Sequence, residues 1–457
     1  MTRRRYKRPL LRVTRRGVLA GLVALAAAPA YGQALLDAGS AGLTPNLETD
    51  QTAALRAAID RSIAEGRPLF LPGGSYTISG LEIPSGATLV GTKGQTRLLA
   101  GGDGPAVRIT NARGVALSDL SFSITMGGGP GTDRGLLELD FCSAIDIRGC
   151  SFTDSGGHGI VVTQGSATID NCYIAGNRNA GIFSRDSLYG QIVTNNRIEG
   201  CGNGGVLIWA TQPGTRDGSI VMGNIITSIR AMGGGNGQNG NGVNVFNADN
   251  VIIADNEIDD CAFTAVRLNA TRNTVVNGNV CTRSGEVAIF SEFGFSGSVI
   301  QGNIIFNAAT GISMTNLDNG GRLAVCANNI VRNIYEGSPV NPDTRPVGIF
   351  AEAEAVINGN TVEDVPAGVG IMAGWGPYLR NVNVVNNIVH GAKIGIGVSV
   401  VEDPAPGPVR VAGNMIYGAT EYAIAGMHWE AVASDDLVRD AAKYPHVTMG
   451  DNMITKA

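Results

Sequence analysis

The sequence predicts an all-β solenoid built from short stacked strands. Two observations carry the prediction: an Asn-centred phrase that repeats along the chain, and a composition suited to strands and tight turns. The phrase is an Asn followed two residues later by a β-former or apolar residue, as in Asn256-Glu257-Ile258. Its copies begin at Asn196, Asn224, Asn256, Asn279, Asn303, Asn329, Asn360, Asn387, Asn414 and Asn452.

The spacing of the phrase is typical of a solenoid. Successive Asn positions from Asn256 onward differ by 23, 24, 26, 31, 27, 27 and 38 residues. A period in this range indicates repeats that cannot bury their apolar face alone and therefore stack on one another. We expect the Asn residues to form one column whose amides hydrogen-bond along the axis, as scaffold and not as catalyst.

Composition and charge exclude several classes of protein. The 457 residues include 65 Gly, 5% aromatic and 16% charged side chains, which favours many short strands joined by turns over helices. Without the first 30 residues, 26 basic and 39 acidic side chains remain, a net charge of -13. Because affinity for nucleic acid depends on basic surface, we expect no nucleic-acid partner. We also expect no stable membrane span in the mature protein.

The N-terminus has the features of an export signal. Basic residues precede Arg15 and Arg16, an Ala-rich apolar run follows from Val18 to Ala28, and Ala28-Pro29-Ala30 offers a cleavage site. The paired arginines with Leu19 resemble the twin-arginine signal, which implies the twin-arginine export machinery as a partner and a periplasmic or secreted protein. A membrane anchor is the alternative, but the apolar run is too short for one.

Seven cysteines cannot all pair. Cys150 and Cys172 occupy the Asn column of earlier repeats, so we expect them to stack in neighbouring turns. Disulfides and small buried fillers are both compatible with such positions. Because twin-arginine export implies folding in the reducing cytoplasm, we favour structural free thiols, and no Cys or His spacing indicates a metal site.

After a loose linker at 31–48, residues 49–66 predict a capping helix. Asp50 is its expected N-cap, Leu55, Ile59 and Ile63 share one face, and Gly66 ends it. With the following Pro- and Gly-rich strands, the passage from Asp50 to Gly91 resembles the entry of pectate-lyase-like right-handed parallel β-helix proteins, where an amphipathic helix plugs the open end. The resemblance implies a right-handed parallel β-helix over 67–457, with about twelve turns and a length of about 60 Å.

Each turn is expected to carry two strands, one ending before the Asn phrase and one starting at a Gly-Ile or similar pair. Long turns interrupt the pattern at Arg230–Asn241, Glu336–Val347 and Glu402–Pro408, and such insertions usually cluster on one face and flank its groove. A short helix at Ser434–Tyr444 and a last turn at Met449–Ile454 are expected to cap the C-terminal end. The export signal, helical plug and Asn-rich turns together resemble the twin-arginine-translocated repetitive proteins of bacteria, a family that implies no particular activity.

The second strand of each turn gives the candidate site. Side chains alternate along a strand, so Ile182 and Ser184 should point inward while Phe183 and Arg185 point outward. In this register two outward stripes mix aromatic, polar and charged groups suited to a sugar polymer, although the long loops could instead cover them. One stripe is Phe183, Leu207, Asn244, Arg267, Phe290, Ser313 and Phe350, and the other is Arg185, Trp209, Phe246, Asn269, Glu292, Thr315 and Glu352. The substrate-binding candidates are Phe183, Trp209, Asn244, Phe246, Asn269 and Phe290.

Two kinds of glycan chemistry are compatible with these stripes. A hydrolase needs two carboxylates, for which the candidates are Asp186, Asp217, Glu257, Asp259, Asp260 and Glu292. A lyase or epimerase needs Arg, Lys or Ca²⁺ beside a uronate, for which the candidates are Arg185, Arg267 and Arg283; no other cofactor or metal is indicated. We assign the catalytic roles to Arg185, Asp186, Arg267 and Glu292.

The motif around His158 resembles part of a known catalytic motif. Gly156-Gly157-His158-Gly159 resembles the Gly-His-Gly of polygalacturonase-type hydrolases, but the accompanying Asp-Asp and Arg-Ile-Lys motifs are missing, so we favour a turn role for His158. The sequence therefore leaves two hypotheses. One is a protein that binds an acidic or neutral polysaccharide along its flank, with or without cleaving or modifying it, and the other is a non-catalytic envelope or interaction protein that uses the solenoid as a display surface. A phage-type tailspike is disfavoured by the export signal.

Overall fold

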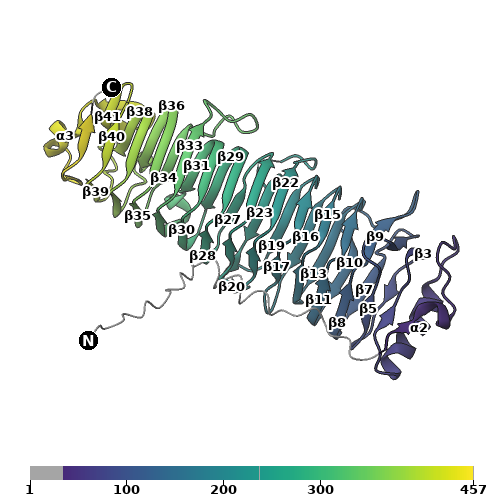
Figure 1. The fold of residues 1–457 in the computed structure, drawn as a ribbon. Coiled ribbons are helices and arrows are strands. Elements are labelled where there is room, and N and C mark those ends of the chain that lie inside the picture. The colour runs from purple at the N-terminus through teal and green to yellow at the C-terminus, as the bar shows by residue number, and fades with distance from the viewer. Residues whose placement is uncertain (1–33, 236, 456–457) are drawn as a thin grey trace, which may run out of the picture.

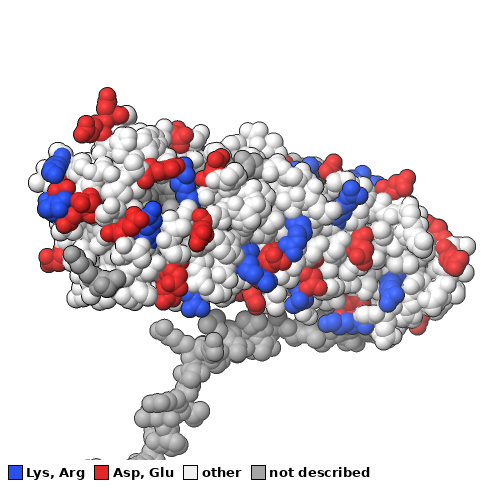
Figure 2. All heavy atoms as spheres, turned by 90° about the horizontal axis from the view of Figure 1, so that it is seen from above, with Lys and Arg blue, Asp and Glu red and all other residues white. Residues whose placement is uncertain are grey.

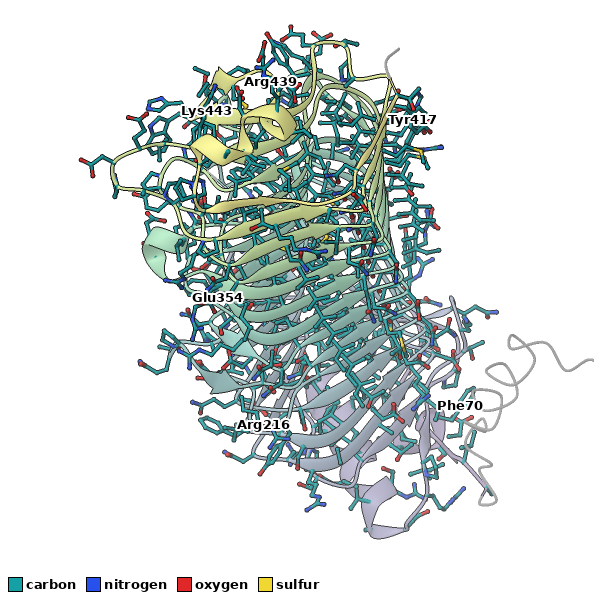
Figure 3. The ribbon with its side chains drawn as sticks, turned by 90° about the vertical axis from the view of Figure 1, so that its left-hand side faces the viewer. Phe70, Arg216, Glu354, Tyr417, Arg439 and Lys443 are labelled. Atoms are coloured by element: carbon teal, nitrogen blue, oxygen red, sulfur yellow. The ribbon has the colours of Figure 1, made fainter. Side chains whose placement is uncertain are left out.

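The computed structural model describes residues 34–235 and 237–455, which form a right-handed parallel β-helix of about 14 turns. The molecule is an elongated rod whose N-terminal helix and C-terminal helix lie at opposite ends (Figure 1). A 16-stranded parallel sheet forms one face, called the first face here, and a 26-stranded sheet bends to form the second and third faces. Figure 3 shows Arg216 and Glu354 on one side of the rod and Phe70 and Tyr417 on the opposite side.

The strands of the three faces follow one another in every turn. The first face contains β1 (Leu36–Asp37), β2 (Leu69–Phe70), β5 (Thr88–Val90), β8 (Arg113–Ser118), β11 (Ser143–Arg148), β14 (Ala167–Asp170), β17 (Ile192–Thr194), β21 (Ile220–Met222), β25 (Ile252–Ala254), β28 (Arg272–Asn277), β30 (Ser296–Gln301), β32 (Arg322–Ala327), β35 (Ala355–Asn358), β37 (Val382–Val385), β39 (Val409–Ala412) and β43 (Val447–Met449). The second face contains β3 (Gly74–Ile78), β6 (Thr96–Ala100), β9 (Ser121–Ile124), β12 (Ser151–Thr153), β15 (Tyr173–Ala175), β18 (Arg197–Glu199), β22 (Ile225–Ile229), β26 (Glu257–Cys261), β33 (Ile330–Ile334), β40 (Met415–Tyr417) and β44 (Met453–Thr455). The third face contains β4 (Leu81–Glu82), β7 (Val107–Thr110), β10 (Gly135–Asp140), β13 (His158–Thr163), β16 (Ala180–Arg185), β19 (Gly204–Trp209), β23 (Asn241–Phe246), β27 (Val266–Asn269), β34 (Val347–Ala351) and β41 (Tyr422–His428).

Four long strands run continuously from the second face into the third. They are β29 (Val280–Glu292), β31 (Ile304–Met314), β36 (Thr361–Ala373) and β38 (Ile388–Ser399). The expectation of two strands per turn was wrong for most turns, because the short segment after the Asn forms a strand of its own, as in β18, except where it runs on into one of these four long strands. The expected twelve turns were also too few.

The Asn column is confirmed as a continuous ladder. The side-chain Nδ2 of Asn279 donates to Asn303 Oδ1 at 3.0 Å and to the carbonyl of Ile253 at 3.0 Å. The backbone N and Nδ2 of Asn256 both donate to Asn279 Oδ1, at 3.0 and 2.9 Å. The side-chain bond between neighbouring asparagines recurs without interruption from Asn196 to Asn452. Each amide thus satisfies the backbone groups of a buried corner, as these groups require.

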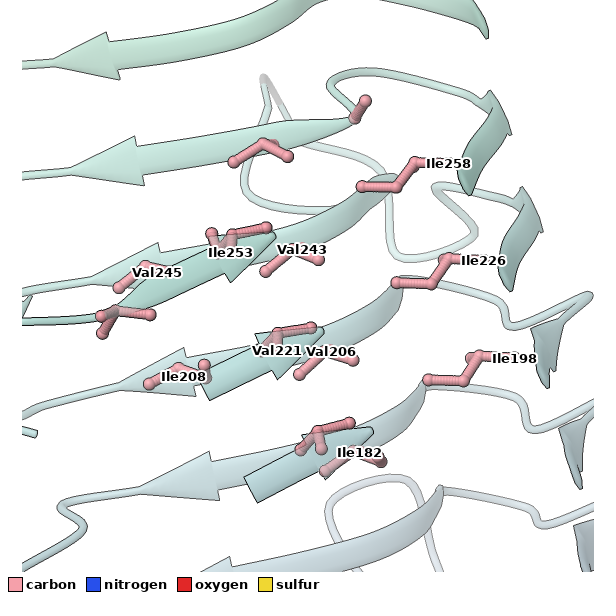
Figure 4. Packing of buried hydrophobic residues seen from close by; sticks show 14 of the residues in the cluster. Ile182, Ile198, Val206, Ile208, Val221, Ile226, Val243, Val245, Ile253 and Ile258 are labelled. Atoms are coloured by element: carbon pink, nitrogen blue, oxygen red, sulfur yellow. The ribbon is translucent and has the colours of Figure 1, made fainter. Parts of the chain in front are cut away.

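The interior is a stack of aliphatic columns. Ile198, Ile226 and Ile258 lie above one another just after the Asn corner, and Val206 and Val243 form a second column beside them (Figure 4). All of these side chains are fully buried. Because adjacent parallel strands are about 4.8 Å apart, identical positions of successive turns pack directly on each other. The repeat period therefore determines which residues meet in the core.

The cysteines belong to this interior. All seven are buried free thiols, as we expected. Cys172 continues the ladder, since its backbone N donates to Asn196 Oδ1 at 2.9 Å, and Cys150 precedes it, with its Sγ donating to the carbonyl of Leu117 at 3.6 Å. Burial raises the pKa of the Cys172 thiol to about 12, so this thiol stays protonated and unreactive.

The N-terminal helix is α2 (Thr52–Ala64), which packs against η1 (Ala38–Ala41), β2 and β4. Its N-cap is Gln51, one residue later than expected, although the carboxylate of Asp50 accepts the Thr52 N–H at 2.7 Å. Leu55 and Ile59 are buried, but Ile63, expected on the same face, is 36% exposed.

The start and the end of the rod differ from expectation. Residues 36–43 are not a loose linker, because Leu36 and Leu43 are buried and β1 pairs with β2. At the other end the predicted helix at Ser434–Tyr444 is shorter and divided into α3 (Leu437–Asp440) and the 3-10 turn η3 (Ala441–Lys443).

Candidate functional site

The outward side of the third face carries the two predicted stripes. Strand pairing aligns Phe183 with Leu207, and Arg185 with Trp209, in consecutive turns. The same register continues through Asn244, Arg267 and Phe290 in one stripe and through Phe246, Asn269 and Glu292 in the other. Ile182 and Ser184 point into the core, as predicted. The alternation of side chains along a strand therefore placed this face correctly.

A row of aromatic rings runs along the N-terminal half of the face. Ring centroids are 5.1 Å apart for His158 and Phe183, 5.3 Å for Phe183 and Trp209, and 6.0 Å for Trp209 and Phe246. Burial lowers the pKa of His158 to about 4, and its ring nitrogens contact Asn179 and the Ala180 N–H. His158 is thus a neutral structural residue, equivalent to Ala180 as predicted, but it is the first residue of strand β13 and does not lie in a turn.

The row opens into a hollow that most of the binding candidates share. This hollow of about 340 Å³, called the aromatic hollow here, is lined by Trp209, Gln238, Asn244, Phe246, Arg267, Asn269 and Phe293. Four of the six predicted substrate-binding residues therefore meet in one place. Phe183 lies further along the ring row, and Phe290 lies under the guanidinium of Arg267, 5.6 Å from its Cζ. Phe293 and Gln238 were not predicted, because both lie in loops outside the strand pattern.

Arg267 forms ion pairs with two buried glutamates at the centre of the third face. Its guanidinium binds Glu292 in a bidentate pair, with distances of 2.6 Å from Nε to Oε1 and 2.9 Å from Nη2 to Oε2. Glu286 lies on its other side, with Oε2 3.7 Å from Nη1. All three side chains are more than nine-tenths buried. Burial raises the pKa of Glu292, and the hydrogen bonds from Arg267 and Asn269 oppose this shift.

A second hollow follows on the C-terminal side of this ion pair. It has a volume of about 280 Å³ and is called the acidic hollow here. Two buried carboxyl groups line it, Glu286 from β29 and Glu352 directly after β34. The rest of its lining consists of aromatic rings, hydroxyl groups, Val287, Asn316 and a loop: Phe290, Phe350, Trp375, Thr310, Ser313, Thr315, Val287, Asn316, Asn341, Asp343, Thr344 and Arg345.

Further rings extend the face beyond the acidic hollow. A hollow of about 210 Å³ has Phe350, Trp375 and Trp429 in its walls. The Trp375 and Trp429 centroids are 5.5 Å apart, and the guanidinium of Arg345 lies 4.6 Å above the Trp375 ring. Arg345 also forms an ion pair of 2.5 Å with Glu430. Aromatic surface therefore runs from Phe183 to Trp429 along one side of the rod.

Two of the three long loops flank this surface at its edge with the second face, and the third lies at its edge with the first face. The loop at 336–346 folds back over the face, where Asn341 Nδ2 donates to Glu286 Oε1 at 2.8 Å and Ser338 donates to the Gly285 carbonyl at 2.6 Å. Gln238 lies over Asn244, whose Nδ2 donates to the Gln238 carbonyl at 3.3 Å. The segment at 402–408 connects the third face to the first face at the other edge. The hollows remain open between these loops.

Several sequence candidates lie away from the hollows. Asp186 is held in the corner after β16, where both of its oxygens accept hydrogen bonds from Thr211, and Arg185 is exposed beside Phe183. Asp217 is buried in a corner and accepts the Ser219 N–H at 2.8 Å. Glu257, Asp259, Asp260 and Arg283 lie on the second face, where Asp259 pairs with Arg283 and Asp260 with Arg230. The catalytic roles given to Arg185, Asp186, Arg267 and Glu292 stay predictions.

The described residues contain no metal-binding cluster and no membrane-spanning helix, and the charges on one face of the rod are seen in Figure 2. In the described part of the chain, no three His, Cys, Asp or Glu side chains come together to hold a metal ion, and Ca²⁺ binding stays a prediction tied to lyase chemistry. The face visible in Figure 2 has acidic and basic side chains interspersed. Within residues 34–235 and 237–455, no helix has the length and apolarity needed to cross a membrane.

Comparisons with known proteins agree with the fold. The family model "Right handed beta helix region" matches residues 135–238. No curated protein matches the chain significantly. The chain is similar to the structure of a PL6 alginate lyase in complex with a trisaccharide, at 14% identity and a TM-score of 0.52 over 92% of this chain and 85% of that one.

Weaker structural similarities extend to other β-helices. The A-module of the mannuronan C-5 epimerase AlgE4 of Azotobacter vinelandii matches at 14% identity and a TM-score of 0.40, over 92% of this chain and 95% of the module. Tailspike protein 3 of bacteriophage CBA120 matches at 12% identity and a TM-score of 0.49, over 88% of this chain and 62% of the tailspike.

Proposed function

We propose that the third face binds a polysaccharide along the aromatic surface between Trp209 and Trp429. The observation that carries the proposal is the succession of outward rings and polar groups along open hollows on one face. The C–H faces of sugar rings are apolar and pack on aromatic rings, while the hydroxyls at their edges bond to amides and carboxylates such as Asn269 and Glu352. An elongated face with this alternation suits a polymer better than a compact ligand.

The charge of the face favours a neutral glycan. Binding a polyuronate would need unpaired cationic side chains along the binding surface. Arg267, however, forms ion pairs with Glu292 and Glu286, and Arg345 forms one with Glu430. Asp343, which lines the acidic hollow and has no ion pair within the described residues, would repel a polyanion. The alginate lyase similarity supports only the point that this fold can accommodate a bound oligosaccharide.

Replacing Trp209 with Ala is expected to weaken glycan binding about tenfold, because a stacking surface of one ring contributes roughly 1 kcal/mol or more. The measurement is calorimetric or gel-shift affinity over a panel of neutral and acidic polysaccharides. Tyr417→Ala is the matched control, since Tyr417 is an exposed ring in β40 of the second face, outside the proposed binding surface. Equal losses for both variants, or no glycan bound by the wild type, would contradict the proposal and favour the display-surface alternative.

We also propose export by the twin-arginine route, with Arg15 and Arg16, which lie outside the described residues, as the recognised pair. Seven buried free thiols agree with folding before export in a reducing compartment. The double variant Arg15→Lys/Arg16→Lys is expected to remain in the cytoplasm of a bacterial host, as measured by fractionation and immunoblotting. Arg12→Lys, outside the pair, should be exported normally. Unchanged export of the double variant would refute this route.

A further inference from the structure

We infer that the acidic hollow hydrolyses glycosidic bonds, with Glu352 as general acid and Glu286 as general base. The inference rests on the proposed glycan binding and adds a reaction and its residues to it. Both carboxyl groups line the same hollow, and their residues are 5% and 3% exposed. Neither was a catalytic candidate from the sequence.

The two carboxyl groups have different surroundings. Glu286 accepts hydrogen bonds from Asn341 Nδ2 at 2.8 Å and Thr264 Oγ1 at 3.1 Å, and it faces the guanidinium of Arg267. These contacts hold the Glu286 carboxyl group in one position at the wall of the hollow, where it can take a proton from a water molecule.

Glu352 forms no ion pair within the described residues. Its Oε2 accepts the Leu317 N–H at 2.7 Å, and the Asn316 backbone also contributes a hydrogen bond to the carboxyl group. Asp318 adds a negative charge in the 3-10 turn Leu317–Asn319. Burial, followed by this neighbouring charge, raises the pKa of Glu352 to about 7. The other charged groups of the hollow are Glu286, Asp343 and Arg345, and Arg345 is paired with Glu430. With a pKa of about 7, Glu352 is protonated in about half of the molecules at pH 7 and in most of them at lower pH, so it can act as a general acid.

The rest of the hollow is suited to a sugar at the cleavage point. Phe290, Phe350 and Trp375 offer ring faces, and the hydroxyls of Ser313 and Thr315, which are 3.1 Å apart, offer hydrogen bonds. The aromatic hollow and the Trp375–Trp429 hollow lie on either side along the rod, so a bound chain would cross the carboxyl pair. The bond to be cleaved would therefore be internal to the polymer.

The reaction balances with water as the only co-reactant. Glu286 takes a proton from a water molecule while the water oxygen forms a bond to the anomeric carbon. The bond from this carbon to the glycosidic oxygen breaks, and Glu352 transfers its proton to the departing oxygen. Two chain ends result, and proton exchange with solvent restores both carboxyl groups. Paired carboxyl groups of opposite protonation are the arrangement that this chemistry requires.

The test compares cleavage with binding in the full chain. We expect the wild type to release reducing ends from a neutral polysaccharide that it binds, and Glu352→Gln and Glu286→Gln to lower kcat at least a thousandfold while Kd changes less than threefold. Glu363→Gln, an exposed glutamate on the second face, is the control and should keep the full rate. The wild-type rate should fall tenfold per pH unit above about pH 7, as Glu352 loses its proton.

The outcomes distinguish a failure of hydrolysis from a failure of glycan binding. A wild type that binds a glycan but releases no reducing ends would overturn hydrolysis and leave the binding proposal standing. A Glu352→Gln variant with a wild-type rate and pH profile would overturn the assignment of the acid. Glu286→Gln could fail to fold because Arg267 loses a partner. In that case the rate of Glu352→Gln and the pH profile of the wild type test the proposed hydrolysis. A wild type that binds no glycan would overturn both proposals.

Discussion

Replacing Arg267 with Met is expected to lower the free energy of unfolding by about 3–5 kcal/mol, the largest effect of any single change at the site. The substitution keeps much of the side-chain volume but leaves Glu286 and Glu292 buried without a cation. Glu292 loses its bidentate partner, and the two carboxylates then repel each other in a region of low dielectric constant. Urea unfolding followed by circular dichroism measures the loss.

A double-mutant cycle separates the ion pair from the packing. Glu292→Gln in the Arg267→Met background should recover part of the lost stability, because it removes one of the unpaired charges. Arg185→Met, at an exposed outward position of the neighbouring stripe, is the control and should change stability by less than about 0.5 kcal/mol. A similar, small effect of Arg267→Met and Arg185→Met would show that Arg267 is solvated in solution and not locked in the face.

Asn279→Ala is expected to cost about 3 kcal/mol, because it leaves several buried backbone groups without partners. The Asn256 N–H and the Ile253 carbonyl lose their bonds to the side chain, and the ladder is interrupted in the middle of the rod. Because each turn contacts only its neighbours, the loss should be local. Amide hydrogen exchange should report weakened protection in the turns on either side, together with a lower urea midpoint.

Asn452→Ala provides the matched control for the ladder. Asn452 is the last member, it is only partly buried, and water can replace its amide. We expect its loss to cost less than half as much as that of Asn279, with exchange changes confined to the C-terminal turn. Equal losses of stability at both positions would mean that burial does not determine how much each Asn of the ladder contributes to stability.

The sequence identified the features that depend on local geometry. The Asn phrase was sufficient to predict the ladder, because stacked corners place equivalent residues within hydrogen-bonding distance of each other. Alternation along a strand was sufficient to predict the outward stripe from Phe183 to Glu292, because side chains change sides at every residue. Cys150 and Cys172 could be placed in the same column for the same reason.

Features that depend on chain segments far apart in sequence were missed. The strand after each Asn, as in β18, is too short to produce a pattern of its own, so two strands per turn were predicted instead of three. Residues 36–43 appeared to be a linker because only pairing with β2 gives Leu36 a buried position. Phe293 could not be assigned to the aromatic hollow, since a loop residue follows no strand alternation.

By itself, the sequence determined that this protein is a β-solenoid with an Asn-lined corner and a mixed aromatic and polar flank, because repeat period and strand alternation are local properties of the chain. Only the tertiary structure determined which charged side chains of the site have ion-pair partners. The loop at 336–346 brings Asn341 to Glu286 across 55 residues, and Arg267 becomes bound between Glu286 and Glu292. Burial and partnership determine the protonation of a carboxyl group, and neither is encoded in residue spacing. The distinction between the paired Glu292 and the cation-free Glu352 therefore arises only in the folded molecule.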